Sequence, residues 1–205
     1  MQIQLNNIGK RYNRDWIFRH CDYTFQVGKS YAIIGNNGSG KSTLLQTIAG
    51  AINPSEGSLD FTVNGQRLAV DDFYKHISLA APYLEVIEEM TATEFLKFHA
   101  AFKPLLTSIT IAEIITIIGL EQNIDKQIRY YSSGMKQRIK LAQAIFSDTP
   151  VLLLDEPCTN LDAAGYQLYQ QLITTHCSHK LIIVSSNDLQ EYSFCEEQIL
   201  IGDYK

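Results

Sequence analysis

The chain has 205 residues, of which 45% are hydrophobic and 19% charged, and its formal net charge is −5. This length and composition predict one globular domain that can bury a sizeable core without disulfides. The acidic balance gives no support for a nucleic-acid partner. The apolar runs are far shorter than the ~20 residues of a membrane span, and the first residues do not resemble a signal peptide. The four cysteines have no C-x-x-C spacing, so we expect reduced thiols in a cytoplasmic protein.

The first 70 residues predict a small antiparallel sheet. Residues 3–12 (IQLNNIGKRY), 22–27 (DYTFQV) and 57–65 (GSLDFTVNG) carry aromatic and β-branched residues between turn signals. A different kind of strand, YAIIG at 31–35, interrupts this series. Its continuous apolar run is typical of a strand buried on both faces of a parallel sheet.

Residues from about 91 to 146 predict a helical lobe. The segments TATEFLKFHAAF and SITIAEIITIIGL have apolar residues at a spacing near 3.6. Two further buried strands follow, VLLLD at 151–155 and LIIVSS at 181–186. Helical stretches at 41–50, 132–146 and 164–175 separate the three buried strands. Each strand ends in a polar or glycine-rich turn, which is where ligands bind in open α/β sheets.

The stretch GNNGSGKST at 35–43 lies between a predicted strand and a predicted helix and fits the phosphate-binding pattern G-x-x-x-x-G-K-[ST]. Its glycines let backbone N–H groups approach phosphate oxygens, and the helix start adds its positive dipole end. Lys41 would reach the β- and γ-phosphates, and Ser42 would offer a hydroxyl to Mg²⁺. The predicted phosphate-binding residues are Gly35, Asn36, Asn37, Gly38, Ser39, Gly40, Lys41, Ser42 and Thr43.

Two acidic residues, Asp155 and Glu156, stand at the end of the second buried strand. Asp155 would hold Mg²⁺ through its water shell, since magnesium keeps several waters in proteins. Glu156 could orient and deprotonate an attacking water. The alternative is a pair of capping acids at a strand end. With the phosphate-binding loop, these residues predict an α/β fold with a P-loop NTPase core, an N-terminal antiparallel β portion and an inserted helical lobe.

A second anion site is predicted at 131–146, YSSGMKQRIKLAQAIF, where Ser132, Ser133 and Gly134 precede an amphipathic helix. One nucleotide needs only one such site, so the second suggests a nucleotide held by another chain. Here the sequence resembles the ATP-binding cassette (ABC) ATPases over nearly its whole length. YSSGMKQR is similar to their signature loop, with Ser133 in place of a glycine and Met135 after Gly134.

This resemblance implies a single ABC ATPase domain over residues 1–205 that binds ATP and Mg²⁺. It implies that Tyr12 stacks on adenine, although Tyr12 could instead be an ordinary strand aromatic. It also implies that Asp162, in TNLD at 159–162, faces a second ABC subunit. In this family two cassettes clamp two ATP molecules head to tail, and each signature loop caps the partner's phosphate-binding loop.

Two family positions are changed. The resemblance aligns Pro82 with a glutamine that contacts the metal and links the nucleotide to the membrane partner. Proline has neither a side-chain oxygen nor a backbone N–H, so both roles are in doubt unless another residue of the loop substitutes.

Asn187 stands at the second changed position, where the family places its switch histidine. Its amide can still donate to a γ-phosphate oxygen, but it cannot become a cation. The alternative is a turn-forming asparagine. We therefore expect hydrolysis that is slow rather than absent, with Glu156 and Asn187 as catalytic residues.

The sequence thus predicts the ATP-hydrolysing subunit of an ABC transporter at the inner face of a membrane. It would drive a separate permease through ATP-dependent dimerisation, as a homodimer or a heterodimer. By resemblance, the signature form GMKQR is found in export-type cassettes, and the short chain is similar to those of cytochrome c maturation; neither fixes a substrate. Two alternatives stay open: a weakly hydrolysing, nucleotide-gated partner in a heterodimer, and a soluble ABC protein without a transport role.

Overall fold

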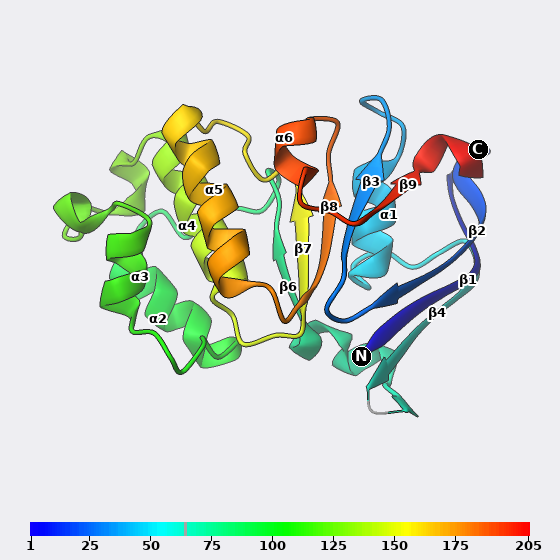
Figure 1. Cartoon of the computed structure of the whole chain (residues 1–205), viewed down its shortest axis with the longest axis horizontal. Coiled ribbons are helices and arrows are strands. Elements are labelled where there is room, and N and C mark those ends of the chain that lie inside the picture. Colours follow the sequence, from blue (N-terminus) through cyan, green and yellow to red (C-terminus); the bar gives the residue numbers. More distant parts are fainter. Residues whose placement is uncertain (64) are drawn as a thin grey trace.

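The computed structural model describes residues 1–63 and 65–205. Its centre is a parallel sheet with the strand order β6-β7-β8-β3-β9 (Figure 1). The strands of this sheet are β3 (Ser30–Ile34), β6 (Ile77–Ala80), β7 (Val151–Asp155), β8 (Leu181–Ser185) and β9 (Glu197–Leu200).

A second, antiparallel sheet flanks the centre and has the order β2-β1-β4-β5. Its strands are β1 (Gln2–Tyr12), β2 (Asp15–Gln26), β4 (Glu56–Val63) and β5 (Gln66–Arg67). Residue 64, at the end of the third predicted segment, lies outside the described residues. The predicted N-terminal antiparallel portion is confirmed, and the strand containing DYTFQV begins seven residues earlier than predicted.

The helices lie on both sides of the parallel sheet (Figure 1). Helix α1 lies between the two sheets, whereas the predicted helical lobe lies on the opposite side. The helical segments are α1 (Lys41–Ile48), η1 (Val70–His76), α2 (Ala92–Phe102), α3 (Ile111–Ile117), η2 (Glu121–Asn123), η3 (Ile128–Tyr130), α4 (Ser133–Ile145), α5 (Ala163–His176), α6 (Leu189–Tyr192) and η4 (Ile201–Tyr204).

The central strands divide two hydrophobic cores. In β7, Leu152 and Leu154 pack into the core of the helical lobe, whereas Val151 and Leu153 pack into the core beneath the antiparallel sheet. Successive side chains of a strand point to opposite faces. A strand with a core on each face therefore needs an apolar residue at every position, which explains the continuous run VLLLD.

Two helices of the lobe begin with reciprocal caps. Thr91 of α2 accepts a hydrogen bond from the N–H of Glu94, and the Glu94 carboxylate accepts one from the N–H of Thr91. Thr110 and Glu113 form the same arrangement at α3. Each pair satisfies two N–H groups that the helix leaves free. The helix α3 ends at Ile117, before Gly119 with φ +68°, because a left-handed glycine favours a helix terminus.

The four cysteines are free thiols, as predicted, and Cys21, Cys158 and Cys177 are buried. Burial raises the pKa of Cys177 to about 11, so this thiol stays protonated at neutral pH. Within the described residues, no helix has both the length and the apolar character needed to cross a membrane.

Candidate functional site

The loop between β3 and α1 forms the cradle that the glycine pattern predicts. Gly35, Gly38 and Gly40 have φ values of +152°, +75° and +107°, which favour glycine. A Cβ at Gly35 would lie 2.7 Å from Cγ2 of Ile201, and a Cβ at Gly40 would collide with the side chain of Ile17. The backbone path of the loop therefore requires glycine at these two positions for space as well as for conformation.

A cavity of about 210 Å³ opens beside this loop. The residues that line it are Ile17, Asn37, Gly38, Gly40, Lys41, Ser42, Thr43 and Glu156. The structure thus brings six of the nine predicted phosphate-binding residues and the predicted general base to one cavity, whereas Gly35, Asn36 and Ser39 are not among its lining residues. Ile17 of β2 is a lining residue that the sequence analysis missed, since nothing in a strand pattern shows that its side chain will face a loop 20 residues later.

Lys41 is only 5% exposed, and its ammonium group points back at the loop. Its Nζ donates to the carbonyl oxygens of Gly35 at 2.9 Å and Asn36 at 3.2 Å. These contacts hold the positive charge at the mouth of the cradle, where the N-terminus of α1 also favours an anion.

Asp155 and Ser42 are the two predicted oxygen ligands for a magnesium ion. Asp155 ends β7 and is 2% exposed, and its Oδ1 atom is buried without a hydrogen-bond partner among the described residues. An unpaired carboxylate oxygen is costly to bury, so it calls for a cation or a water. Mg²⁺ is usually held by one or two protein oxygens together with substrate phosphates. The pair fits that role, and no cluster of three or more His, Cys, Asp or Glu residues occurs among the described residues.

Glu156 turns out of β7 into the cavity. Its φ is +42°, an uncommon value for a residue with a side chain, and its N–H donates to the carbonyl oxygen of Ser185 at 2.9 Å. The bond joins the ends of β7 and β8, so the position of Glu156 is fixed by the sheet rather than by a free loop.

Asn187 follows β8 and meets the phosphate-binding loop. Its Nδ2 donates to Oδ1 of Asn37 at 3.0 Å, across 150 residues of sequence. Both side chains are exposed. The two asparagines therefore lie close together at the entrance of the cradle.

The second predicted anion site forms a separate cavity of about 270 Å³. It is lined by Ser132, Ser133, Gly134, Met135, Arg138, Asn160, Leu161 and Asp162. Ser132 caps α4 by accepting from the N–H of Met135 at 3.2 Å. Asp162 caps α5 by accepting from the N–H of Gly165 at 2.8 Å, and its Oδ1 lies 3.8 Å from Nη2 of Arg138. This cavity shares no lining residue with the cavity beside Lys41.

Tyr12 lines neither of the two cavities. It is the last residue of β1, its side chain is 48% exposed, and Nζ of Lys10 lies 5.2 Å from the centre of its ring. Tyr12 is not among the residues that line the cavity beside the phosphate-binding loop. Its predicted contact with adenine therefore stays a prediction.

Pro82 lies in a tight turn directly after β6. The N–H of Leu84 donates to the carbonyl oxygen of Ala81 at 3.2 Å, and Nζ of Lys140 donates to the carbonyl oxygen of Pro82 at 3.0 Å. The side chain of Pro82 is exposed and has no polar atom to offer the site. The next residue, Tyr83, has a phenol that contacts Gln46, and burial together with the charge of Asp155 raises the pKa of Tyr83.

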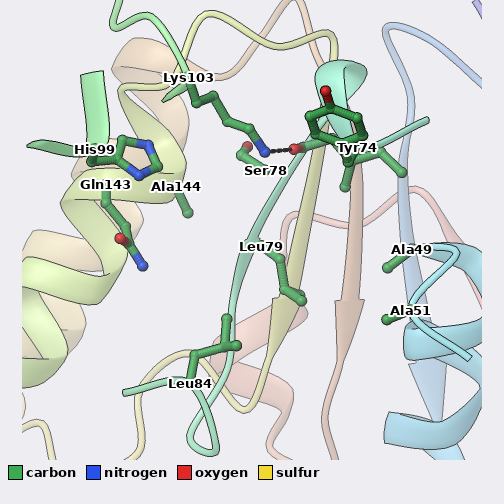
Figure 2. A pocket seen from close by; sticks show the side chains of 11 residues that line it. Ala49, Ala51, Tyr74, Ser78, Leu79, Leu84, His99, Lys103, Gln143 and Ala144 are labelled. Carbon is green, nitrogen blue, oxygen red and sulfur yellow. Dashed lines mark hydrogen bonds between the residues drawn. The ribbon is translucent and has the colours of Figure 1, made fainter. Parts of the chain in front are cut away.

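A groove of about 340 Å³ separates the helical lobe from the parallel sheet (Figure 2). It is mostly apolar and is lined by Ala49, Ala51, Tyr74, Ile77, Ser78, Leu79, Leu84, His99, Lys103, Gln143 and Ala144. The Lys103 ammonium crosses from the end of α2 and donates to the carbonyl oxygen of Ile77. Burial lowers the pKa of Lys103, and burial together with Lys103 lowers the pKa of His99.

Glu191 of α6 is a buried residue that lies four positions after Asn187. It is 3% exposed, its Oε1 accepts from the N–H of Cys158 at 2.7 Å, and its Oε2 accepts from the hydroxyl of Ser186. The same hydroxyl accepts from the N–H of Asp188 at 2.9 Å. Burial raises the pKa of Glu191. Its carboxyl group thus joins the loop after Glu156 to the loop that carries Asn187.

Comparisons with known proteins agree with this arrangement. The family model described as ABC transporter matches residues 18–159. The chain is 32% identical to an uncharacterized ABC transporter ATP-binding protein of Bacillus subtilis, YybJ, over 95% of this chain and 89% of that protein. It is 31% identical to the cytochrome c biogenesis ATP-binding export protein CcmA of Agrobacterium fabrum, over 91% and 88%. It is also 31% identical to the lantibiotic transport ATP-binding protein SrtF of Streptococcus pyogenes, over 92% and 81%.

Solved structures show the same fold. The dimeric, post-hydrolysis cassette MJ0796 bound to ADP and phosphate superposes with a TM-score of 0.81 at 22% identity, covering 98% of this chain and 95% of that one. The ATP-binding subunit of an ABC transporter superposes with a TM-score of 0.80, also at 22% identity, covering 98% and 87%. The predicted fold class and family are therefore confirmed, and the chain belongs to the ABC transporter family as one of its ATP-binding proteins.

Proposed function

We propose that this chain binds and hydrolyses ATP in the cavity beside Lys41 and drives a separate membrane permease through ATP-dependent dimerisation. One observation carries the proposal: a single chain holds two separate cavities suited to anions, one at the start of α1 and one at the start of α4. A helix N-terminus favours negative charge. If a second cassette turns head to tail, the α4 cavity of each chain covers the phosphates held by the other.

The residues of the first cavity divide the work of phosphoryl transfer. Lys41 and the N–H groups of the glycine-rich loop bind the β- and γ-phosphates, and Ser42 and Asp155 would hold Mg²⁺. The ion would neutralise charge on the phosphate oxygens. Glu156 accepts a proton from the attacking water. Asn187 donates an amide N–H toward the γ-phosphate, from a position beside Asn37.

Ser132, Ser133, Gly134 and Asp162 are assigned to the nucleotide of the partner subunit. Among the similar proteins, one solved cassette is described as dimeric and bound to ADP and phosphate. Tyr12 is assigned to the adenine ring, since it lies exposed near the end of the β1–β2 hairpin.

The groove between the helical lobe and the sheet is assigned to the permease, which places the cassette at the inner face of the membrane. The groove is apolar, and the partly buried Lys103 gives it a positive charge. An acidic side chain on a cytoplasmic segment of the permease would pair with Lys103, since a partly buried charge gains from an opposite one. Lys103→Glu should therefore release a polytopic membrane protein that co-purifies with the wild type. The exposed Lys97→Glu on the same helix is the control.

The test of the core proposal uses Glu156→Gln. This change removes the proton acceptor but keeps the size of the side chain, so ATP should stay bound and hold two chains together. Size-exclusion chromatography with ATP should show a dimer for Glu156→Gln and a monomer for Lys41→Ala, which lacks the phosphate-binding ammonium. A Glu156→Gln chain that binds ATP and remains a monomer would contradict a cassette dimer of this chain with itself.

A weakly hydrolysing partner in a heterodimer is the second candidate, and Pro82 and Asn187 favour it. A turnover assay separates the two proposals. Stimulation of hydrolysis only when a second, different cassette is present supports the heterodimer.

A further inference from the structure

Ser185 is a polar residue in the interior of the parallel sheet whose side chain makes no hydrogen bond within the described chain. It is the last residue of β8 and is fully buried. Its Oγ atom is buried without a partner among the described residues. A buried hydroxyl group without a partner weakens the fold. The residue therefore calls for a polar partner such as water.

Asp155 is the neighbour of Ser185 on the adjacent strand. The register of β7 and β8 pairs Asp155 with Ser185, and neighbouring strands of a sheet lie about 4.8 Å apart. The N–H of Glu156 donates to the carbonyl oxygen of Ser185 at 2.9 Å, which continues the pairing past the end of β7. The two residues therefore lie side by side at the carboxyl edge of the sheet.

The side chains of Asp155 and Ser185 also lie on the same face of the sheet. Leu153 of β7 and Ile183 of β8 pack into the core beneath the antiparallel sheet, together with Leu44 of α1. Side chains two residues apart on a strand share a face. Asp155 and Ser185 therefore point toward the side that α1 covers, where the phosphate-binding loop leads into that helix (Figure 1).

The two neighbouring oxygen atoms are complementary in their hydrogen-bonding capacity. Oδ1 of Asp155, like Oγ of Ser185, is buried without a partner among the described residues, so no direct hydrogen bond joins the two atoms. An ionised carboxylate only accepts hydrogen bonds, whereas a hydroxyl group also donates. A buried water molecule typically bonds polar groups that have no other partner. One water between them would satisfy both atoms.

We propose that Ser185 is a positioning residue for Asp155. Its hydroxyl donates to a water molecule, and that water donates to Oδ1 of Asp155. The bridge holds the carboxylate in the orientation that binds the water shell of Mg²⁺. The inference rests on the proposed ATP site, and it adds to that site a residue that no motif of the sequence singles out.

Ser185→Ala tests this because it removes only the hydroxyl. The measured quantity is the dissociation constant of ATP, by calorimetry, with Mg²⁺ and with EDTA. For the wild type, Mg²⁺ should tighten binding. In Ser185→Ala we expect that gain to shrink by about 10-fold, the effect of losing one hydrogen bond near a charged group. Affinity in EDTA should be unchanged.

Thermal unfolding of the nucleotide-free protein separates this role from a structural one. Ser185→Ala should leave the melting temperature unchanged, because the hydroxyl has no direct bond to a protein group. Ser30→Ala is the matched control. Ser30 begins β3 at the opposite end of the sheet, and its hydroxyl donates to the carbonyl oxygen of Phe194 at 3.1 Å and accepts from the N–H of Glu196 at 3.2 Å. This control should lower the melting temperature and keep the full gain from Mg²⁺.

Three results would count against these assignments. An unchanged gain from Mg²⁺ in Ser185→Ala would overturn the inference while leaving the ATP site intact. An equal loss in both buffers, or a fall in melting temperature like that of Ser30→Ala, would also overturn it, because the hydroxyl would then support the fold rather than the metal. A wild type that binds no ATP would overturn the proposed function itself.

Discussion

Asn187 and Asn37 form a pair that neither residue's own motif predicts. The amide of Asn187 uses one of its two N–H groups on Asn37, at 3.0 Å. The other N–H is the group that the proposed contact with a γ-phosphate oxygen would use. A contact between exposed amides contributes little to stability, so the pair serves mainly to orient Asn187 at the cradle.

Asn187→Ala should lower the turnover of ATP by about 10-fold, since it removes one hydrogen bond to a charged group. Steady-state hydrolysis at saturating ATP measures the change. Asn37→Ala should have a smaller effect of the same sign, because it removes only the orienting partner. Turnover equal to the wild type in Asn187→Ala would leave Asn187 as a turn residue without a catalytic role.

Asn187→His should hydrolyse ATP at least as fast as the wild type. A histidine reaches further and can become a cation, and its pKa lies near 6.5. The turnover of ATP should therefore change with pH between about pH 6 and 7.5 in a way that the wild type does not show. A profile that matches the wild type over this range would show that the side chain at this position does not contact the transferred phosphate.

The elements that carry Glu156 and Asn187 are held together by one buried carboxyl group. Glu191 opens no cavity and binds no predicted ligand, yet it accepts from Cys158 after β7 and from Ser186 after β8. Within the described chain it has no ion-pair partner. It is therefore a positioning residue whose hydrogen bonds, rather than an opposite charge, stabilise its burial.

Glu191→Ala should destabilise the protein by about 1–3 kcal/mol, since it leaves the N–H of Cys158 and the hydroxyl of Ser186 without partners. It should also lower turnover, because both loops lose their link. Thr149→Val is the control. It removes a buried hydroxyl that lies two residues before β7 and donates to Ser78 of β6, at the opposite end of β7 from the two loops. Thermal unfolding should shift in both variants, whereas turnover should fall only in Glu191→Ala.

The pKa of Glu191 also makes stability depend on pH. Burial raises this pKa, with the charges of Asp188 and Glu156 adding to the effect. The folded state then holds the proton more tightly than the unfolded state does. This contribution to stability is fully present below the unfolded value of about 4.3 and is lost as the pH rises through the raised folded value. Glu191→Gln should lack this decrease in the free energy of unfolding when denaturation curves are measured across the pH range.

The sequence predicts the long and strongly patterned elements well, and the short ones poorly. The runs YAIIG, VLLLD and LIIV mark β3, β7 and β8 because each strand is buried on both faces. The strands β6 and β9 have four residues each, and β9 is half exposed at the edge of the sheet. Their patterns are too short to separate from loops, and only pairing with β7 and β3 makes them strands.

The same difference applies to the site. Lys41, Ser42 and Asp155 were found because a motif fixes their spacing along the chain. Ile17 and Glu191 were missed because tertiary packing brings them to the site from a strand and a short helix that carry no such spacing.

At the scale of the whole molecule, each of the two anion cavities would form one half of an ATP site in the proposed dimer. Lys41→Ala removes the phosphate-binding half, and Gly134→Asp places a negative charge in the other half, where an added Cβ would already lie 3.1 Å from the carbonyl oxygen of Asn160. We expect each variant alone to be inactive. In a mixed dimer, the intact phosphate-binding loop of the Gly134→Asp chain faces the intact start of α4 in the Lys41→Ala chain.

An equal mixture of the two variants should therefore recover turnover that neither variant has alone, since each mixed dimer has one intact site of its two. The measurement is ATP hydrolysis of the mixture against each variant alone. No recovery from two folded, nucleotide-competent chains would show that a different cassette is the true partner of this one.

The turn Ala81–Leu84 has one further consequence for the molecule. Leu84 lines the groove, and the turn begins beside Asp155, because β6 and β7 pair Ala80 with Leu154. A segment seated in the groove that moves this turn changes the affinity for Mg²⁺ and ATP. Thermodynamic linkage then requires the nucleotide to change the affinity for that segment by the same factor. Pro82→Gly loosens the turn, so it should weaken the effect of the segment on nucleotide affinity and the effect of the nucleotide on segment affinity by the same factor. Titration of the nucleotide with and without the segment, and of the segment with and without the nucleotide, would measure the two effects.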